Sequence, residues 1–549
     1  MVKLNFDKPN QLFYGDNIAV LRAMPPEVVD LCYIDPPFNS KRNYFQIYNG
    51  INDEVDRAQS QAFMDTWQWG ADAIDGLKFI ESPVNMTGND PRYVTFSEQT
   101  VNLIKGLHLV LGNSGLMAYL VSMTLRISEI HRVLKDTGSF YLHCDPTASH
   151  YLKLICDSIF CAKNRSGRFL NEIIWSYRTG GVSKTKHLAR KHDVIFFYSK
   201  GKDFKINPMI ERQYLGKKFM DSKLDSDGRH YIDTYLRDCL EGTYGLKIVQ
   251  DSQGDYNLED ELRDFLHAEI VTVDSSGKVS ERFNTRPVLN LSKERLGYAT
   301  QKPKGLLELL LRIASNPGDL VLDAYCGCGT TVAVAQKLNR RWIGIDITYQ
   351  SISLILKSLK DSNREHWPEV EKTIYLSGAP EDIESARALA NNRDDRLRKE
   401  FEKWAVLTYS NNKAQINDKK GKDQGIDGIS YFMKDRDSAT HRDVIGKVIY
   451  QVKSGKVGSK DIRDLIGVCA SEKGDMGILI TLEPPTRDME MAVHRAGKID
   501  IPIMGRSYPA IKIVTIQELM AGSRDDDLPL VYDVVKSAQK APESEQPLL

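Results

Sequence analysis

Four consecutive residues near the N-terminus, Asp35, Pro36, Pro37 and Phe38, place a carboxylate, a rigid turn and an aromatic ring after the apolar segment 28–34. An amine on an aromatic ring is a poor nucleophile because its lone pair is delocalised into the ring. Acceptors on both of its N–H groups, the Asp35 carboxylate and the Pro36 carbonyl, would draw the nitrogen toward sp³ geometry. Two prolines make a stiff platform because each restricts φ, and the Phe38 ring would stack on the substrate ring. The simpler alternative is a strand that ends in a Pro-Pro turn.

A second candidate site lies much later in the chain, where the apolar segment 320–322 runs into Asp323 and a glycine-rich turn. Glycines allow a tight turn and the close approach of a ligand, and the helix that follows offers free N–H groups to an anion. The next apolar segment ends at Asp346, whose carboxylate could accept both hydroxyls of a ribose. The pattern predicts a site for a nucleoside-bearing cofactor, with candidate ligands Asp323, Tyr325, Gly327, Gly329, Thr330 and Asp346. A purely structural turn is the alternative, and the spacing of the glycines disfavours NAD and P-loop nucleotides.

A third group of candidate residues lies toward the C-terminus. Asp427 stands in a Gly-Ile-Asp-Gly turn, and Gln451 and Lys453 follow two positions apart on an apolar segment, which puts them on one face of a strand. Asp427 and the Gln451 amide oxygen would share a magnesium ion that activates water and polarises a phosphate. Lys453 would stabilise the developing negative charge, and Glu402 is a further candidate ligand. Because glutamine is a poorer magnesium ligand than a carboxylate, an inactive domain that only docks on DNA or a partner is the alternative.

Strand and helix patterns place these residues on an α/β framework. The expected strands are 11–14, 28–34, 139–143, 172–175, 194–198, 320–322, 342–345, 448–452 and 477–481, and the expected helices include 18–24, 119–134 and 304–314. The alternation is lost over 201–290. We therefore predict one domain from residues 1–200 and 290–380, a variable region at 201–289, an exposed linking helix within 381–400, a second α/β domain at 401–522 and a polar tail at 523–549.

Composition sets further bounds. At 549 residues the chain is too long for a single core. Its 74 Lys and Arg balance its 74 Asp and Glu, so net charge neither indicates nor excludes a nucleic-acid partner. Residues 161–192 hold eight bases and one acid, which is either a DNA contact or a solvated face. Eight scattered cysteines without a CxxC pair suggest neither a disulfide framework nor a zinc site. Without a signal region or an apolar span, we expect a cytoplasmic protein with no membrane partner.

Residues 10–200 and 290–350 resemble an amino-directed DNA methyltransferase of the permuted, beta-type order, in which the catalytic motif precedes the cofactor motif. The resemblance rests on residues 35–38 and 323–331, and also on 14–17, 142–145, 171–175 and 300–303. It implies a Rossmann-like, S-adenosylmethionine-dependent fold. Asp16 would lie near the cofactor adenine, and Gln301, Lys302 and Pro303 would border its methionine end. The family pattern more often has Pro-Phe and a small residue where this chain has residues 324–326.

The resemblance also implies a substrate. The partner would be double-stranded DNA, from which the target base is flipped into the site. Asp rather than Ser at position 35 favours adenine N6 over cytosine N4, with N4-cytosine as the alternative. Residues 201–289 would recognise the target sequence, and the basic loop 178–192 would touch phosphates or line the flipped base. A methyltransferase for RNA or a small molecule is disfavoured because the motif and its order are of the DNA type.

Residues 400–520 resemble the Mrr-like branch of PD-(D/E)xK restriction nucleases, in which Gln replaces the usual acid. Segments 461–467 and 477–481 fit the helix and strand that follow in that family. The whole chain would then belong to a prokaryotic restriction-modification context, with DNA cleavage by the second domain. The resemblance leaves a second copy of the chain and a separate restriction subunit open as protein partners.

Overall fold

The computed structural model describes residues 4–37, 43–47, 59–64, 67–82, 94–176, 192–241, 249–250, 256–257, 269–288, 292, 294, 296, 301–380, 382–391, 395–410, 413–416, 425–436 and 443–521, apart from 6, 68, 216, 219–220 and 237–238. Phe38, most of the basic loop 178–192 and the tail 523–549 lie outside these residues, so what was predicted for them stays a prediction.

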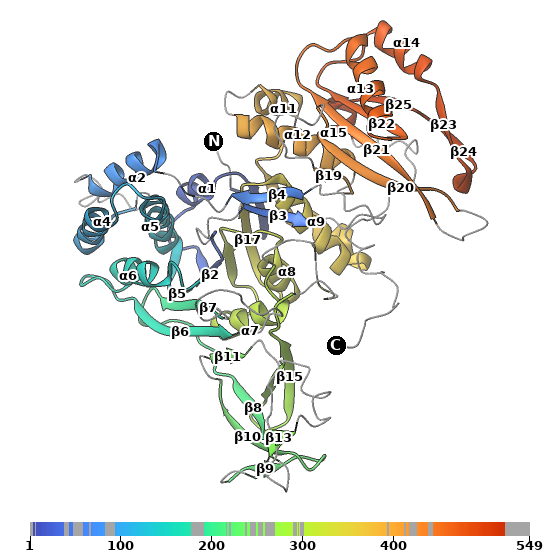
Figure 1. The fold of residues 1–549 in the computed structure, drawn as a ribbon. Coiled ribbons are helices and arrows are strands. Elements are labelled where there is room, and N and C mark those ends of the chain that lie inside the picture. Colours follow the sequence, from blue (N-terminus) through green and yellow to red (C-terminus); the bar gives the residue numbers. More distant parts are fainter. Residues whose placement is uncertain are drawn as a thin grey trace.

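A nine-stranded sheet in the order β11-β6-β7-β5-β2-β16-β17-β1-β18 forms the centre of the molecule (Figure 1). Six neighbouring strands, from β5 to β18, are parallel, and β7 runs antiparallel to both β5 and β6. The bounds are β1 Asn10–Tyr14, β2 Val29–Ile34, β5 Leu134–Cys144, β6 Arg168–Ser176, β7 His192–Ser199, β11 Cys239–Glu241, β16 Leu320–Asp323, β17 Arg341–Asp346 and β18 Ile374–Ser377.

Strand β2 shows why these segments form a central sheet. All six of its residues are buried, as expected for a parallel strand covered on both faces. Successive side chains point to opposite faces. Leu31 and Tyr33 therefore join one apolar core, and Cys32 and Ile34 join the other. The sheet is covered by helices on both sides, which confirms the predicted α/β fold class.

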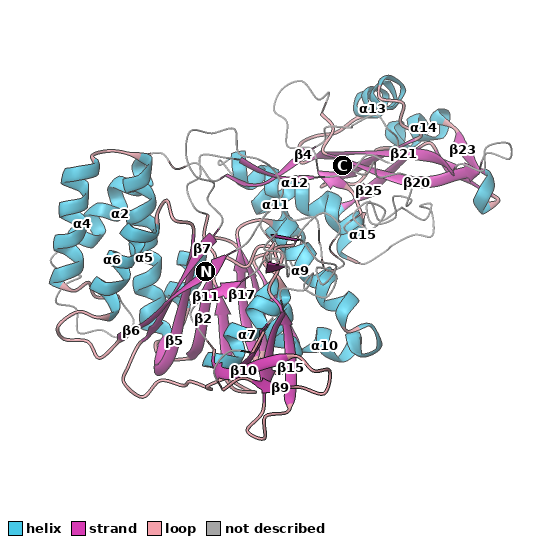
Figure 2. Cartoon of the chain, turned by 60° about the horizontal axis from the view of Figure 1, so that its bottom comes forward, coloured by secondary structure: helices cyan, strands magenta, loops and turns pink. Residues whose placement is uncertain are grey.

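The two helical layers are separate in Figure 2. One layer gathers α2, α4, α5 and α6 together with α1, and the other contains α7, α8 and α9. The bounds are α1 Asn17–Ala23, α2 Ala71–Glu81, α4 Glu98–Leu111, α5 Gly115–Val133, α6 Ser149–Phe160, α7 Lys304–Ala314, α8 Thr330–Lys337, α9 Tyr349–Ser362 and α10 Trp367–Thr373. A hairpin of β3 (Asn43–Ile47) and β4 (Gln59–Met64) precedes α2.

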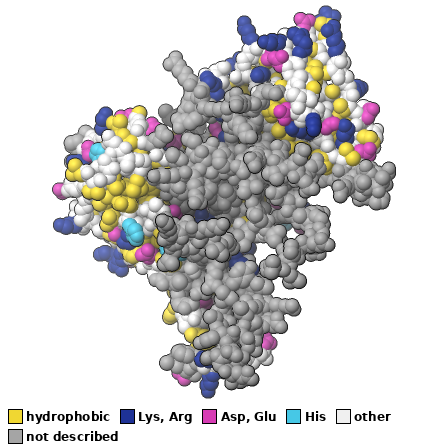
Figure 3. All heavy atoms as spheres, in the orientation of Figure 1, with side chains coloured by type: hydrophobic (Ala, Val, Ile, Leu, Met, Phe, Trp, Pro, Cys, Tyr) yellow, Lys and Arg dark blue, Asp and Glu magenta, His cyan; other side chains and the backbone are white. Residues whose placement is uncertain are grey.

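The surface of the first layer carries apolar side chains (Figure 3). Leu109 and Val110, at the end of α4, are 87% and 82% exposed. In the described part of the chain, no helix is both long enough and apolar enough to cross a membrane.

Residues of the predicted variable region form a separate antiparallel sheet, in the order β15-β14-β8-β10-β9, which projects from the central sheet (Figure 1). An ion pair between Arg312 of α7 and Glu281 of β15, at 3.1 Å, connects it to the helices that cover the central sheet. The bounds are β8 Ile210–Leu215, β9 Lys223–Leu224, β10 His230–Tyr235, β14 Glu269–Val273 and β15 Val279–Asn284, and β12 Val249–Gln250 pairs with β13 Tyr256–Asn257.

The C-terminal part is built on a five-stranded sheet in the order β19-β20-β21-β22-β25. Strands β20 and β21 are antiparallel, whereas β21, β22 and β25 are parallel. The bounds are β19 Gln415–Ile416, β20 Gly428–Arg436, β21 Asp443–Lys453, β22 Met476–Thr481, β23 Lys498–Ile501, β24 Arg506–Pro509, β25 Ile511–Thr515, α12 Asp395–Tyr409, α13 Ser459–Ser471, α14 Arg487–Ala496 and α15 Ile516–Met520.

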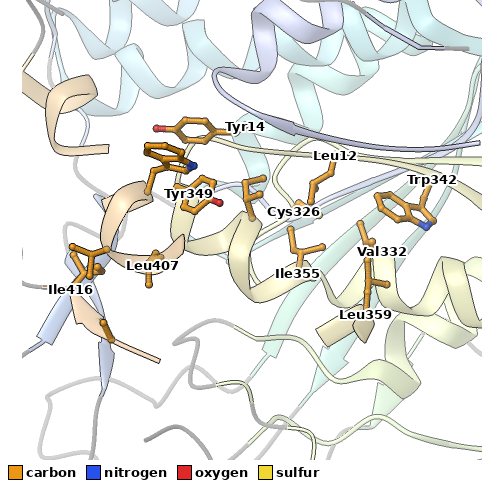
Figure 4. Packing of buried hydrophobic residues seen from close by; sticks show 14 of the residues in the cluster. Leu12, Tyr14, Cys326, Val332, Trp342, Tyr349, Ile355, Leu359, Leu407 and Ile416 are labelled. Atoms are coloured by element: carbon orange, nitrogen blue, oxygen red, sulfur yellow. The ribbon is translucent and has the colours of Figure 1, made fainter. Parts of the chain in front are cut away.

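The segment between the two α/β sheets differs from the single exposed helix that its charged composition suggested. It contains α11 (Ile383–Ala390) and the start of α12. Ala386 and Ala390 are small enough to let α11 and α12 approach each other, and this contact buries both residues. Side chains of α9 and α12 belong to one apolar cluster, part of which is drawn in Figure 4.

Candidate functional site

Three aspartates from distant parts of the sequence converge at the carboxyl edge of the central sheet. Strand β2, which leads to Asp35, lies directly beside β16, which ends at Asp323. Strand β17 follows on the other side of β16 and ends at Asp346. All three strands are parallel, so their carboxyl ends meet at one edge, where open α/β sheets bind ligands.

Burial makes this edge electrostatically unusual. It raises the pKa of Asp323 to about 7, although hydrogen bonds from Thr331 and the Tyr325 N–H act in the opposite direction. Asp35 and Asp346 contribute to the increase by repulsion. Burial also raises the pKa of Asp346 to about 6. Perturbed carboxylates of this kind favour a site that binds positive charge.

The glycine-rich turn is shaped around Asp346. The Gly327 N–H donates to Asp346 Oδ2 at 2.8 Å, and the Thr348 N–H donates to Oδ1 at 2.9 Å. Gly327 and Gly329 have φ values of +52° and +80°, which favour glycine. A Cβ at Gly329 would lie 2.5 Å from Ile355 Cγ1, so the turn leaves no room for a side chain there. Helix α8 begins directly afterwards, at Thr330.

Asp16 joins the same edge together with Asn17 and with Arg126, which the sequence did not single out. Asp16 caps α1 and accepts from Arg126 Nη2 at 2.9 Å. Arg126 Nε also donates to Asn17 Oδ1 at 2.6 Å, and Asn17 Nδ2 donates to the Ala324 carbonyl at 2.8 Å. Asn17 lay within the motif at 14–17, whereas Arg126, on α5, had no local signal. The Tyr325 hydroxyl donates to Met123 Sδ at 3.5 Å.

The catalytic candidate Asp35 has one oxygen engaged and one free. Its Oδ2 accepts from Lys302 Nζ at 2.5 Å. Its Oδ1 is buried and has no hydrogen-bond partner among the described residues. Burial alone would lower the pKa of Lys302, but Asp35 and Asp193 raise it above its ordinary value. Lys302 therefore presents a cation to Asp35.

The neighbours of Lys302 make different contacts. Gln301 Oε1 accepts from the Leu296 N–H, and its Nε2 donates to the Glu294 carbonyl, both at 2.7 Å. Gln301 thus holds Glu294 and Leu296 in place by hydrogen bonds. Pro303 is the N-cap residue of α7. Pro36 is buried beside Asp35.

A buried series of hydrogen-bonded side chains connects β2, the strand that leads to Asp35, to its neighbours in the sheet. The Tyr33 hydroxyl is 2.8 Å from His143 Nδ1, and His143 Nε2 is 3.1 Å from Asp193 Oδ2. Trp175 packs edge-on against His143 and donates to the Thr285 carbonyl at 2.8 Å. His143 and Trp175 belong to the motifs 142–145 and 171–175. Their contacts link side chains of the neighbouring strands β6, β7, β5 and β2.

The C-terminal candidates also come together. The Val452 N–H donates to Asp427 Oδ2 at 2.7 Å. Burial raises the pKa of Asp427 to about 7, Glu402 of α12 raises it further by repulsion, and Lys399 and Lys453 oppose the increase. A Cβ at Gly425 would lie 3.5 Å from Gln451 Nε2 and 3.9 Å from Lys453 Nζ, so both side chains reach the same turn as Asp427.

Within the described chain, no group of three or more His, Cys, Asp and Glu side chains is arranged to hold a metal ion. The predicted set differs in composition, since it combines the Asp427 and Glu402 carboxylates with the Gln451 amide.

A doubly covered parallel sheet, a glycine turn after one strand and an acid after the next define the class of α/β enzymes that use a nucleoside-bearing cofactor. Residues 29–357 match the family model described as DNA methylase, and the chain belongs to that family. Residues 397–504 match a model described as restriction endonuclease. Both matches confirm the predicted combination of an amino-directed DNA methyltransferase and an Mrr-like nuclease domain.

Curated relatives are distant. The type II methyltransferase M.EcaI of Enterobacter cloacae is 27% identical over 44% of this chain and 57% of its own length, so the chain spans little more than half of that relative. The DNA adenine methyltransferase YhdJ of Escherichia coli is 24% identical over 66% of this chain and 86% of its own length.

Solved structures are also similar at low identity. The putative DNA modification methylase TTHA0409 of Thermus thermophilus, complexed with S-adenosyl-L-methionine, is 14% identical and covers 64% of this chain and 93% of its own, with a TM-score of 0.31. The cytosine-N4-specific PvuII DNA methyltransferase is 12% identical and covers 67% and 94%, with a TM-score of 0.33.

Proposed function

We propose that the chain transfers a methyl group from S-adenosylmethionine to N6 of adenine in double-stranded DNA. The observation that carries the proposal is the buried Oδ1 of Asp35, which has no hydrogen-bond partner among the residues that the structure describes, at the sheet edge where the strands of Asp323 and Asp346 also end. Membership of the DNA methylase family supports the reaction class. The aspartate at position 35 and the adenine specificity in the name of the Escherichia coli relative support adenine over cytosine N4.

The residues at the edge fit this cofactor. S-adenosylmethionine carries a sulfonium and an ammonium charge, and the buried carboxylates of Asp323 and Asp346 would stabilise this positive charge. We assign Asp346 to the ribose of the cofactor. Gly327, Gly329 and Thr330 would let the cofactor approach the backbone closely, and Asp16 would lie near its adenine. When bound, the cofactor supplies an electrophilic methyl group.

Asp35 would act on the amine rather than on the cofactor. Its Oδ1 accepts one N6–H and the Pro36 carbonyl accepts the other, so that the nitrogen lone pair turns toward the methyl group. Charge that develops on the nitrogen is stabilised by the carboxylate, which is already in position. Lys302 holds the other oxygen and so keeps the side chain in one orientation. Phe38 would stack on the flipped base.

We assign target recognition to the antiparallel sheet of residues 201–289. Arg212 of β8 pairs with Asp233, and Arg229 in the turn before β10 pairs with Asp225, each at 2.8 Å, which favours a structural role for both arginines. Lys217, Lys218, Lys223 and Lys278 are exposed and suit contacts with phosphates. Phosphate contacts position a protein on DNA, whereas base contacts specify the sequence. The basic loop 178–192 would add to the same surface.

We further propose that the C-terminal domain cleaves DNA with a magnesium ion held by Asp427, Gln451 and Glu402, and with Lys453 facing the phosphate. The shared turn at Gly425 supports this grouping. Modification and cleavage would then reside on one chain, without a separate restriction subunit. The second candidate is a domain that only binds DNA or a partner, which the glutamine at position 451 favours.

The test of methylation uses the full chain, duplex DNA and S-adenosylmethionine, followed by digestion to nucleosides and mass spectrometry. N6-methyladenine is expected, and it should be missing with Asp35→Ala. N4-methylcytosine instead would replace the adenine assignment with the cytosine one. No methylated base on DNA of varied sequence would overturn the proposal.

A further inference from the structure

One acidic side chain of the C-terminal domain, Glu400 of α12, lies at the cofactor edge of the methyltransferase sheet. Its Oε2 accepts from the Tyr349 N–H at 3.1 Å and from the Tyr14 hydroxyl at 3.4 Å. Its Oε1 accepts from Lys403 Nζ at 3.0 Å, and the side chain is only 13% exposed. Glu400 lies outside the part of the chain that matches the DNA methylase model and inside the part that matches the nuclease model.

The two partners of Glu400 flank the carboxylate assigned to the ribose. Tyr14 is paired with Asp346 between β1 and β17, and the Gly15 N–H donates to the Asp346 carbonyl at 2.9 Å. Thr348, directly before Tyr349, donates from both its N–H and its hydroxyl to Asp346 Oδ1. Glu400 therefore ties together the two segments that fix Asp346.

The two tyrosines also contact each other. Their rings meet edge to face, with centroids 5.8 Å apart, and they lie side by side in Figure 4. Burial raises the pKa of Tyr14, and Glu400 raises it further, so the hydroxyl remains a donor. Because the Tyr349 N–H opens α9, a carboxylate there also faces the positive end of the helix dipole.

An apolar seam holds Glu400 in this place. Phe401, Trp404 and Leu407 of α12 belong to the same cluster as Ile352 and Ile355 of α9. The Tyr349 hydroxyl is also 3.2 Å from Thr408 Oγ1. Both apolar packing and hydrogen bonds therefore join α12 to the start of α9, and together they fix the position of Glu400.

We propose that Glu400 is a positioning residue for the methyltransferase cofactor, and that the nuclease-like domain is in this way part of the cofactor site. The inference rests on the proposed function, because it takes Asp346 as the ribose ligand. In this role Glu400 acts through its contacts with Tyr14 and Tyr349, which fix residues 14–15 and 348–349 so that Asp346 is presented in one orientation. A methyltransferase domain without α12 would lack this support.

The consequence for α12 is that one helix serves both sites. Residues two positions apart on a helix point in nearly opposite directions, because a turn takes 3.6 residues. Glu400 thus faces the cofactor edge, and Glu402 faces Asp427, whose pKa it raises by repulsion.

The test uses full-length variants Glu400→Ala and Glu400→Gln, with Glu384→Gln on the exposed face of the neighbouring α11 as the charge control. Cofactor affinity is measured by calorimetry with S-adenosylmethionine and with S-adenosylhomocysteine. Loss of one hydrogen-bonded carboxylate should weaken binding about tenfold in Glu400→Ala. Glu400→Gln should recover part of the affinity, because its amide oxygen still accepts from Tyr349. Glu384→Gln should match the wild type.

Steady-state kinetics separates positioning from general loss of structure. A positioning role predicts a raised KM for S-adenosylmethionine with kcat retained at saturating cofactor, whereas partial unfolding would lower kcat. If Glu400→Ala does not fold, Glu400→Gln decides. Affinities of both variants within twofold of the wild type would overturn the inference alone. A wild type that does not bind S-adenosylmethionine at all would instead overturn the proposed function.

Discussion

Lys302 and Asp35 form a partly buried ion pair, with Lys302 Nζ 2.5 Å from Asp35 Oδ2. The two residues are far apart in the sequence, and they meet because β2 lies beside β16 while α7 begins just after Lys302. The pair leaves Asp35 Oδ1 without a hydrogen-bond partner in the described part of the chain and fixes the carboxylate before any substrate binds. A fixed acceptor lowers the cost of reorganisation in the transition state.

The first prediction concerns Lys302→Met. Losing the cation frees the Asp35 side chain to rotate, so methyl transfer measured in single turnover should slow about 10²-fold. Cofactor affinity, measured by calorimetry, should change much less. Lys302→Arg keeps the positive charge but replaces the compact ammonium group with a planar guanidinium group. Its methyl-transfer rate should therefore lie between the rates of the wild type and of Lys302→Met. A large loss of cofactor affinity with an unchanged transfer rate would support the alternative role of Lys302 at the methionine end of the cofactor.

The second prediction concerns Asp35 itself. Asp35→Ala should reduce methyl transfer by at least about 10²–10³-fold, because the amine loses its charged acceptor. Asp35→Asn keeps the shape but offers one neutral acceptor, so it should also be strongly impaired. Both variants should bind S-adenosylmethionine almost as the wild type does, because Asp323 and Asp346 are untouched. If both variants lost affinity for S-adenosylmethionine to the same extent, Asp35 would be assigned to cofactor binding instead.

The third prediction concerns pH and the stability of the cofactor-free protein. The folded-state pKa of Asp323, about 7, lies above the ordinary value of 3.8, so the folded state binds an extra proton between these values. Its contribution to stability is therefore fully present below about pH 4 and is lost as pH rises through 7.

Asp323→Asn removes this titration while an amide oxygen can still accept from the Tyr325 N–H. The Tm of the variant minus the Tm of the wild type should therefore increase from pH 5 to pH 8, as measured by scanning calorimetry without cofactor. A difference that is independent of pH would contradict the assignment. Asp346, with a pKa of about 6, should contribute in the same direction at slightly lower pH.

Local sequence predicted the parts of the site that local structure determines. Asp323 and Asp346 are the last residues of buried strands, and Gly329 occupies a backbone conformation and a space that suit only glycine. Those constraints are visible within a few residues of each position. The strand and helix patterns also predicted the α/β fold class, because strands such as β2 and β16 are short, apolar segments that lie between helical ones.

Other contacts depend on how distant elements pack, and no local pattern reports them. Lys302 was expected to border the methionine end of the cofactor, which stays a prediction, and no local pattern indicated that its Nζ would contact Asp35. Arg126 is one of several polar residues on α5, and only the approach of α5 to α1 brings it to Asp16. Glu400 stands in a charged segment whose composition suggested solvent exposure, yet the apolar side chains that follow it in α12 draw it into the seam with α9.

The last prediction concerns DNA cleavage. Lys453→Ala should stop magnesium-dependent cutting of unmodified DNA and leave methylation unchanged, because Lys453 is the cation beside Asp427 and Gln451. Lys456→Ala, an exposed lysine three positions later, is the matched control and should cut normally. Gel analysis of plasmid DNA with magnesium measures both variants.

The pH profile offers an independent check on the same site. A carboxylate must be ionised to hold magnesium, and the pKa of Asp427 is raised to about 7 by burial and by Glu402. Cleavage at limiting magnesium should therefore increase as pH rises through 7, and excess magnesium should shift the midpoint to lower pH because the metal competes with the proton. If the Lys453→Ala variant still cut DNA, Lys453 would have no role in cleavage. No cleavage by the wild type on modified or unmodified DNA, with cofactor and metal varied, would establish the domain as a binding module.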